Sequence, residues 1–160
     1  MLLSETRAFE QVTLALMQRI AGDTAGAKVT AEQARNTFER LLREQPDSWF
    51  YTASLSNAYA LMGEKDLALK LAERAIMILP RAKSAVRGPA MEENLALIQT
   101  IFGEFGPAIS TLSQLLQTPY ESWEWVSPIV ITPAILRLDP LWDPLRADPR
   151  FQKLCQEKKP

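Results

Sequence analysis

Three aspartates near the end of the chain have a spacing that could serve either metal chemistry or structure. Asp139, Asp143 and Asp148 are each followed by proline within "LDPLWDPLRADPRF", residues 138–151. A calcium loop of the EF-hand type needs oxygen ligands at alternate positions around a central glycine. These aspartates are four and five residues apart with no glycine among them, which does not favour a metal site. Because aspartate caps helices and proline starts them, each Asp-Pro pair is expected to open a short helical turn.

The other residues that could do chemistry form two carboxylate pairs and one thiol. Glycoside hydrolysis needs two carboxylates that face each other across a substrate. Glu92 and Glu93 are adjacent and would point apart on a helix, and Glu121 with Glu124 has nothing to hold it across a substrate, so both pairs are expected to be solvated charges. Cys155 cannot be activated by histidine, because the sequence contains none. The sequence therefore predicts no enzyme, no cofactor and no metal site.

Composition narrows the classes of partner. The 160 residues, of which 47% are hydrophobic, fit a single globular domain over 1–160. A net charge of −1 argues against a nucleic-acid binder, which usually has a basic face. The longest apolar stretch, "VSPIVITPAIL", is interrupted by two prolines and is shorter than the roughly 18 residues of a membrane span. A single cysteine and a charged N-terminal segment predict a cytoplasmic protein without membrane or nucleic-acid contacts.

Three glycines anchor an internal repeat. A leucine and a small residue lie eight and seven residues before each glycine, and small or apolar residues and a proline follow. The positions are Leu14, Ala15, Ala34, Leu41 and Pro46 around Gly22; Leu55, Ser56, Ala68, Ala75 and Pro80 around Gly63; and Leu95, Ala96, Ala108, Leu115 and Pro119 around Gly103. Small residues allow two helices to approach closely, and glycine ends a helix in the left-handed conformation. The pattern predicts three helix pairs.

The first repeat carries an insertion. Ala34 follows Gly22 by twelve residues, whereas Ala68 follows Gly63 by five. The seven extra residues, in "GDTAGAKV", include glycines and small side chains without apolar periodicity, so they are expected to form an exposed loop. "TAEQ", which begins at Thr30, reads as the capping box that starts the following helix.

The segment "WFYTASLSNAYALMGEKDLALKLAERAIMILP", residues 49–80, resembles a tetratricopeptide repeat (TPR). With Trp49 as position 1, the residues that carry the resemblance are Leu55, Ser56, Tyr59, Gly63, Ala68, Ala75 and Pro80, at positions 7, 8, 11, 15, 20, 27 and 32. Residues 8–46 and 89–119 match less well. The stretch "LRLDPLWDPLRADPRF" is similar to the ending LRLDPxWDPLRxxPRF of a group of bacterial multidomain proteins with C-terminal TPR regions. The resemblance implies an all-α fold: a right-handed superhelix of about three helix pairs, followed by an arm and a short-helix cap at 120–160.

In the TPR family, the first helix of each pair lines a groove that binds a protein or peptide segment. By repeat register, the implied groove residues are Phe9, Val12, Leu16, Arg19, Phe50, Asn57, Leu61, Glu93, Leu97 and Thr100. A competing interpretation is that the chain fills part of this groove itself. The segment "YESWEWVSPIVITP", residues 120–133, is too apolar for a free linker and is expected to pack on the repeats.

Two functions remain open from the sequence. The first is a non-catalytic scaffold that binds a partner segment through its groove or a flank. The alternative is an accessory module that packs an apolar flank near residues 1–16 against a catalytic or DNA-binding domain of a longer chain. Homodimerisation is left open by both. At the other end, Trp142, Leu145 and Phe151 are expected to form a structural cap, because each repeat buries its face only on a neighbour.

Overall fold

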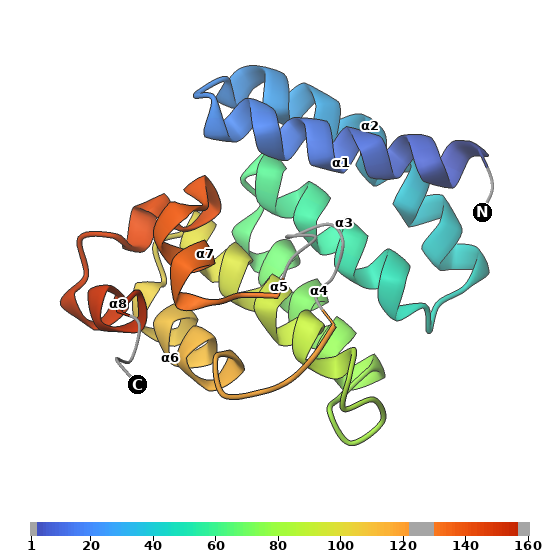
Figure 1. The fold of residues 1–160 in the computed structure, drawn as a ribbon. Helices are drawn as coiled ribbons and strands as arrows, with labels where there is room; N and C mark the ends of the chain where they lie inside the picture. The colour runs from blue at the N-terminus through green and yellow to red at the C-terminus, as the bar shows by residue number, and fades with distance from the viewer. Residues whose placement is uncertain (1–2, 122–129, 157–160) are drawn as a thin grey trace. The chain divides into compact units, whose positions relative to one another are not determined.

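The computed structural model describes residues 3–121 and 130–156, and its regular elements there are all helical (Figure 1). The all-α fold class predicted from the sequence is therefore confirmed. The chain divides into two compact units, Met1–Ile78 and Leu79–Pro160, and each is described by itself. Within the described ranges, none of the helices combines the length and the apolar composition that crossing a bilayer requires.

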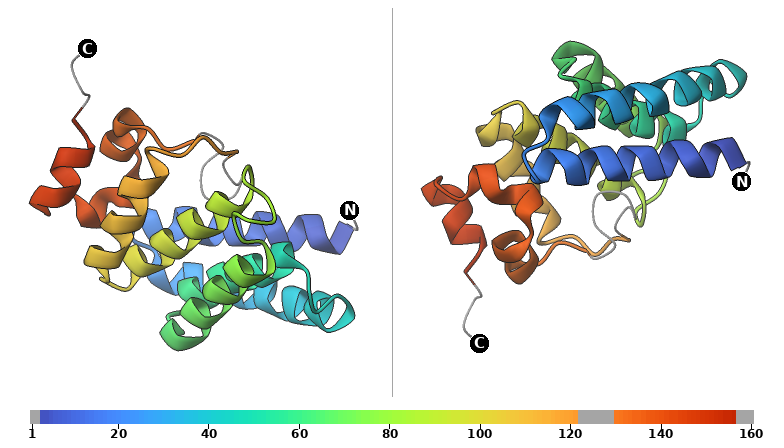
Figure 2. Two further views of the ribbon diagram at one scale, coloured as in Figure 1. Left: turned by 90° about the horizontal axis from the view of Figure 1, so that it is seen from below. Right: turned by 90° about the horizontal axis from the view of Figure 1, so that it is seen from above.

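The first unit contains two helix pairs. α1 (Leu3–Ile20) and α2 (Thr24–Glu44) form the first pair, and α3 (Trp49–Met62) and α4 (Lys65–Ile78) form the second. α2 packs against both α1 and α3, and α3 packs against α4. Figure 2 shows α1 and α2 lying side by side and running in opposite directions. The predicted repeats at 8–46 and 49–80 thus correspond to two helical hairpins.

The repeat glycines end their helices as predicted. Gly22, Gly63 and Gly103 have φ angles of +88°, +86° and +78°, in the left-handed region that favours glycine. Gly63 is the C-cap of α3, and its backbone N–H donates to the carbonyl oxygens of Tyr59 and Ala60. A β-carbon at these positions would meet open space, so the backbone angle, and not crowding, accounts for the glycines.

The prediction of an exposed loop between the first two helices is wrong. α2 begins at Thr24, and the Asp23 side chain caps it by accepting the Gly26 N–H at 2.8 Å. The seven extra residues therefore lengthen α2 by about two turns, and Thr30 lies inside the helix instead of at its start. Ala27 is 1% exposed, whereas a loop would have left it in solvent. Small residues close to α1 let the extended helix continue to pack, which explains the difference.

Helix α3 is buried on nearly all sides, although it carries several hydroxyl groups. Those groups bond within the helix: Thr52 donates to the Ser48 carbonyl at 2.7 Å, and Ser54 donates to the Phe50 carbonyl at 2.8 Å. Because such bonds satisfy the hydroxyls locally, burying them carries little desolvation penalty. The alanines at the predicted close contacts, Ala15, Ala34, Ala68 and Ala75, are each 0% exposed.

The second unit contains the third helix pair and a series of short helices. α5 (Gly88–Ile101) packs against α6 (Phe105–Leu115). The chain then forms α7 (Pro133–Leu138), the 3₁₀-helix η1 (Pro140–Leu145) and α8 (Pro149–Leu154). η1 packs against α5, and α8 packs against α6. Both helices of the third pair are therefore covered by the C-terminal segment.

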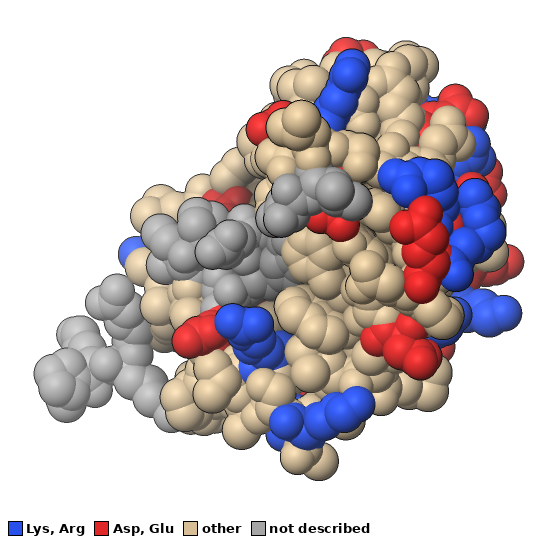
Figure 3. Space-filling model, turned by 90° about the vertical axis from the view of Figure 1, so that its right-hand side faces the viewer, with Lys and Arg blue, Asp and Glu red and all other residues tan. Residues whose placement is uncertain are grey.

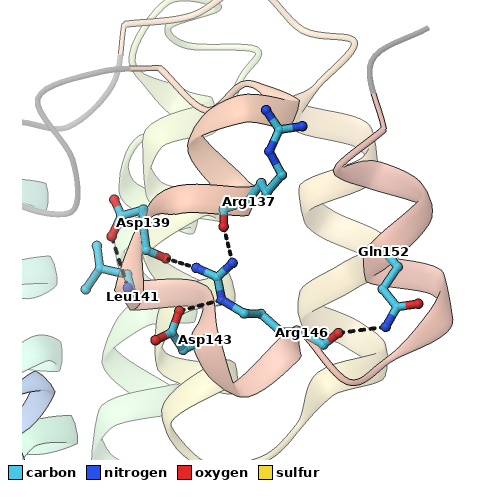
Figure 4. A network of polar contacts seen from close by, with 6 residues as sticks. All are labelled: Arg137, Asp139, Leu141, Asp143, Arg146 and Gln152. Carbon is cyan, nitrogen blue, oxygen red and sulfur yellow. Dashed lines mark hydrogen bonds and ion pairs between the residues drawn. The ribbon is translucent and has the colours of Figure 1, made fainter.

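Two of the three Asp-Pro pairs open helices as predicted. Asp139 Oδ1 accepts the Leu141 N–H at 3.0 Å to cap η1, and Asp148 Oδ1 accepts the Arg150 N–H at 2.8 Å to cap α8. The prediction was wrong for Asp143, which lies inside η1. Its Oδ1 instead accepts the Arg146 Nε–H at 2.6 Å (Figure 4). The arginine also donates to the Arg137 carbonyl oxygen, so it ties the end of α7 to η1.

The predicted cap residues are in the core. Trp142 and Leu145 are 0% exposed and Phe151 is 1% exposed. The apolar side chains of α6 that lacked a following repeat, including Leu112 at 0% and Leu115 at 1%, are also buried. Prolines restrict the backbone at the starts of α7, η1 and α8. The cap therefore covers the third pair through short, individually capped turns.

Candidate partner-binding site

The predicted groove residues of the first unit differ in exposure. Val12, Leu16, Asn57 and Leu61 are buried at 4%, 7%, 7% and 5% exposure. The remaining three, Phe9 and Arg19 of α1 and Phe50 of α3, are half-buried. Only these last three present substantial side-chain surface to a partner in this conformation.

An aromatic cluster joins α1 and α3 at this surface. The rings of Phe9 and Phe50 stack with centroids 6.1 Å apart and an interplanar angle of 20°. The rings of Trp49 and Phe50 lie nearly perpendicular, with centroids 5.9 Å apart and an interplanar angle of 87°. Aromatic side chains in such offset and edge arrangements contribute large contact areas at protein interfaces. The aromatic cluster, Phe9, Trp49 and Phe50, is therefore the best-formed candidate contact of the first unit.

Trp49 was not among the groove residues predicted from the sequence. It occupies the first position of the TPR-like segment, which the family register does not assign to the groove. The sequence feature that could have indicated Trp49 is the run "WFY" at residues 49–51, because these three aromatic residues form the first turn of α3. Tyr51, the third of them, is buried at 7% exposure and is directed toward the interior.

Tyrosine–glutamate hydrogen bonds hold α3 to its neighbours. Tyr51 donates its hydroxyl to Glu5 of α1, and Tyr59 donates to Glu39 of α2 at 2.5 Å. The Glu5 bond, with burial, raises the pKa of Tyr51 to about 12. Burial and the Glu39 bond raise the pKa of Tyr59 to about 12. These bonds fix the orientation of α3, and with it the position of Phe50.

In the second unit, the predicted groove residues of α5 are buried. Glu93 is 0% exposed, and Leu97 and Thr100 are each 2% exposed. Glu93 Oε2 accepts the hydroxyl of Tyr120 at 2.7 Å. Its other oxygen, Oε1, is buried and has no hydrogen-bond partner among the described residues. Burial raises the pKa of Glu93 to about 7, with the Tyr120 bond lowering it and the charge of Asp139 raising it further.

Tyr120 belongs to the arm that was expected to pack on the repeats. It is 8% exposed, and a backbone hydrogen bond from Ile131 also reaches its phenol group. The Glu121 N–H donates to the Val86 carbonyl at 2.9 Å. Both described ends of the arm therefore meet at one tyrosine, and this tyrosine contacts a predicted groove residue of α5. Residues 122–129 lie outside the described part of the chain.

The prediction that Glu92 and Glu93 are solvated charges is wrong. Glu92 is bound at both oxygens by the guanidinium of Arg81, at 2.6 and 2.7 Å, while Glu93 is enclosed in the core. They do point apart, because the two side chains reach different partners. Of the second pair, Glu121 lies 3.7 Å from Arg87 and both are exposed; Glu124 is outside the described residues.

The C-terminal residues singled out for chemistry have structural partners. Each of the three aspartates accepts a hydrogen bond, as a cap or from Arg146. Arg150 holds the pKa of Asp148 down to about 2. Burial raises the pKa of the Cys155 thiol, which disfavours the nucleophilic thiolate. Among the residues that the structure describes, no three His, Cys, Asp or Glu side chains are grouped as a metal site requires.

Comparison with known proteins identifies no relative. No family model matches the chain, and neither the curated proteins nor the solved structures contain a significant match.

Proposed function

We propose that this protein is a non-catalytic scaffold of TPR-like helix pairs that binds a protein segment. The observation that carries the proposal is the recurrence of one hairpin design. Gly22, Gly63 and Gly103 each have positive φ, and alanines that follow them on the second helix, among them Ala68 and Ala108, are 0% exposed. Repeated hairpins of this kind build extended surfaces for protein recognition. The TPR-like superhelix is part of the proposal.

The partner surface is assigned to α1 and α3. The aromatic cluster supplies an apolar contact, and Arg19 supplies a positive charge ten residues after Phe9 on α1. At the rise of an α-helix this separation is about 15 Å along the axis. A segment of roughly five extended residues or ten helical residues spans that distance. We propose a partner with apolar side chains at one end and an acidic side chain at the other.

The groove positions of α5 are not part of this partner surface. Glu93 is already bound by Tyr120 of the chain's own arm, and a partner would have to displace a buried hydrogen bond to reach it. In the second unit, we therefore favour the interpretation that the chain's own arm fills the groove positions of α5. The partner is assigned to the α1–α3 surface of the first unit.

The surface charge supports a protein partner over a nucleic acid. On the face drawn in Figure 3, basic and acidic side chains are intermingled beside wide uncharged areas. The net charge of the sequence is −1. Nucleic-acid binding is driven by clustered positive charge, which favours a protein segment as ligand. A cytoplasmic location is proposed on the single cysteine.

Site-specific photo-crosslinking tests the assignment. A photoreactive amino acid at position 19 or position 50, in the cells that make this protein, should yield the same crosslinked protein. The matched control is position 28, because Lys28 is exposed on α2 away from the aromatic cluster. Phe9→Ala should reduce the yield from position 19 at unchanged helical circular dichroism. Equal yields from positions 19 and 28 would contradict the proposed surface.

A further inference from the structure

One face of α1 has the residue spacing of a coiled-coil contact. The α1 seam consists of the residues that fall at alternating intervals of four and three: Leu3, Arg7, Glu10, Leu14 and Met17. The seam is exposed, with Leu3 at 92%, Leu14 at 53% and Met17 at 49%. The core side of α1 carries Ala8, Val12 and Ala15, at a helical angle nearly opposite to the seam. A single exposed apolar side chain needs no explanation, but here three of them share one helix face with an arginine and a glutamate at coiled-coil spacing.

We propose that the α1 seam binds the α1 seam of a second copy of this chain, in antiparallel orientation about a two-fold axis. In this arrangement, a residue of one copy faces a residue of the second copy when their two residue numbers add up to 17. Leu3 lies against Leu14 of the second copy, and Arg7 lies against Glu10 of the second copy. Two-fold symmetry repeats both contacts, so one helix face supplies two leucine pairs and two opposite-charge pairs.

Charge complementarity selects this arrangement. A parallel pairing would place Arg7 against Arg7 and Glu10 against Glu10 of the second copy, and like charges at facing positions are unfavourable. An antiparallel pairing shifted by one heptad would place Arg7 against Met17 and Glu10 against Leu14. That register desolvates the charges without compensation. In the proposed register, each leucine of the seam faces a leucine of the second copy, and each charged residue faces a residue of opposite charge.

The surface beside the seam has room for incoming side chains. A hollow of about 420 Å³ adjoins the N-terminal half of α1, lined by Leu3, Ser4, Arg7, Ala8 and Gln11 of α1 and Gln33 and Thr37 of α2. In the proposed register, Leu14 of the second copy lies against Leu3, at the edge of this hollow. Side chains inserted between those of a facing helix are the basis of coiled-coil packing.

The contact is expected to be weak. The paired stretch from residue 3 to residue 14 is about 17 Å long at the rise of an α-helix. Two helices paired over that length bury less than the roughly 1,200–2,000 Å² of a standard stable interface. We therefore expect a dimer that dissociates in the micromolar range and whose population changes with protein concentration.

Charge reversal at the seam tests the proposal by sedimentation of the full chain. The wild type should shift from monomer to dimer as concentration rises to about 0.5 mM. Arg7→Glu and Glu10→Arg should each weaken association at least about tenfold, because like charges then face each other. An equimolar mixture of the two variants should associate. The Arg7→Glu chain has negative charges at positions 7 and 10, and these face the positive charges at positions 10 and 7 of the Glu10→Arg chain. The double variant Arg7→Glu/Glu10→Arg should also recover association.

The controls separate this contact from other modes of association. Arg7 and Glu10 are exposed, so far-ultraviolet circular dichroism should be unchanged by these substitutions. Lys28→Glu reverses an exposed charge on α2 and should leave the dimer intact. A wild type that stays monomeric at about 0.5 mM would overturn the proposal and leave the seam to another occupant, such as a domain of a longer chain. A dimer unaffected by Arg7→Glu, or variants that fail to associate when mixed, would also overturn it.

Discussion

Tyr120 donates its hydroxyl to Glu93 across 2.7 Å, and both side chains are buried. The tyrosine begins the arm and the glutamate belongs to α5, so one hydrogen bond attaches the arm to the third helix pair. The other two tyrosines of the chain bond to glutamates in the same way, Tyr51 to Glu5 and Tyr59 to Glu39. Tyrosine–glutamate bonds therefore connect α3 to α1 and α2 in the first unit and the arm to α5 in the second.

The ionisation of Glu93 should make stability depend on pH. Burial raises its pKa from 4.5 to about 7, so the folded state retains a proton that the unfolded state loses between these values. Stability contributed by this group is full below about pH 4.5 and decreases as the pH rises to about 7, by about 3 kcal/mol. Glu93→Gln should remove this decrease in urea unfolding measured from pH 4.5 to 8.

Glu92→Gln is the matched control for that measurement. It removes the adjacent carboxylate and its bond to Arg81, which shifts stability but should preserve the slope between pH 4.5 and 7. A Glu93→Gln protein whose stability still falls over this range would show that another group causes the pH dependence.

The buried carboxylate illustrates where the sequence was informative and where it was not. Glycine and alanine periodicity predicted the three helix pairs, because backbone angle and close helix contact restrict those positions to a few residue types. The fate of Glu93 depends on Tyr120, which is 27 residues away. No local pattern brings those two side chains together. The TPR repeat register alone therefore assigned Glu93, which is a core residue, to the groove.

The insertion after Gly22 shows a second limit. Its residues, with a glycine, several small side chains and no apolar periodicity, have the composition of a loop. Asp23 nevertheless caps a helix there, and α1 is long enough to support two more turns of α2. Tertiary packing overrode weak local propensity, and the length of α1 was the signal that could have indicated this.

Helix α2 should be sensitive to its cap. Asp23→Ala removes the side-chain acceptor of the Gly26 N–H and should lower the free energy of unfolding by about 1 kcal/mol. Asp23→Asn should be nearly neutral, because asparagine caps about as well. Chemical denaturation of the three proteins tests this. Equal losses in the alanine and asparagine variants would mean that the aspartate charge, and not the cap, stabilises the helix.

The C-terminal cap should depend on Trp142 much more than on Asp143. Trp142 is 0% exposed, and replacing a buried tryptophan with alanine costs about 3–5 kcal/mol. Asp143 makes an exposed ion pair with Arg146, so Asp143→Ala should cost less than about 1 kcal/mol. Denaturant melts of both variants give the comparison. Similar losses would indicate that the Asp143–Arg146 pair organises η1 beyond its own contact.

The two tyrosine–glutamate bonds of the first unit should differ in strength. Glu5 is buried at 9% exposure, so Tyr51→Phe removes a hydrogen-bond donor from a buried carboxylate and should cost about 1–3 kcal/mol. Glu39 is half-buried, and water can replace the donor after Tyr59→Phe, which should cost about 1 kcal/mol or less. Thermal unfolding of both variants checks the order, and a larger loss for Tyr59→Phe would contradict it.

The tyrosine–glutamate bonds also give the protein an intrinsic optical reporter. Tyr51 and Tyr59 have pKa values of about 12, and the pKa of Tyr120 is raised further by burial and Glu93. An unfolded chain would form tyrosinate near pH 10, whereas the folded chain keeps its phenols neutral at that pH. Since these are the three tyrosines of the sequence, the near-ultraviolet absorbance of tyrosinate in mild alkali measures the unfolded fraction directly, without an added dye or label.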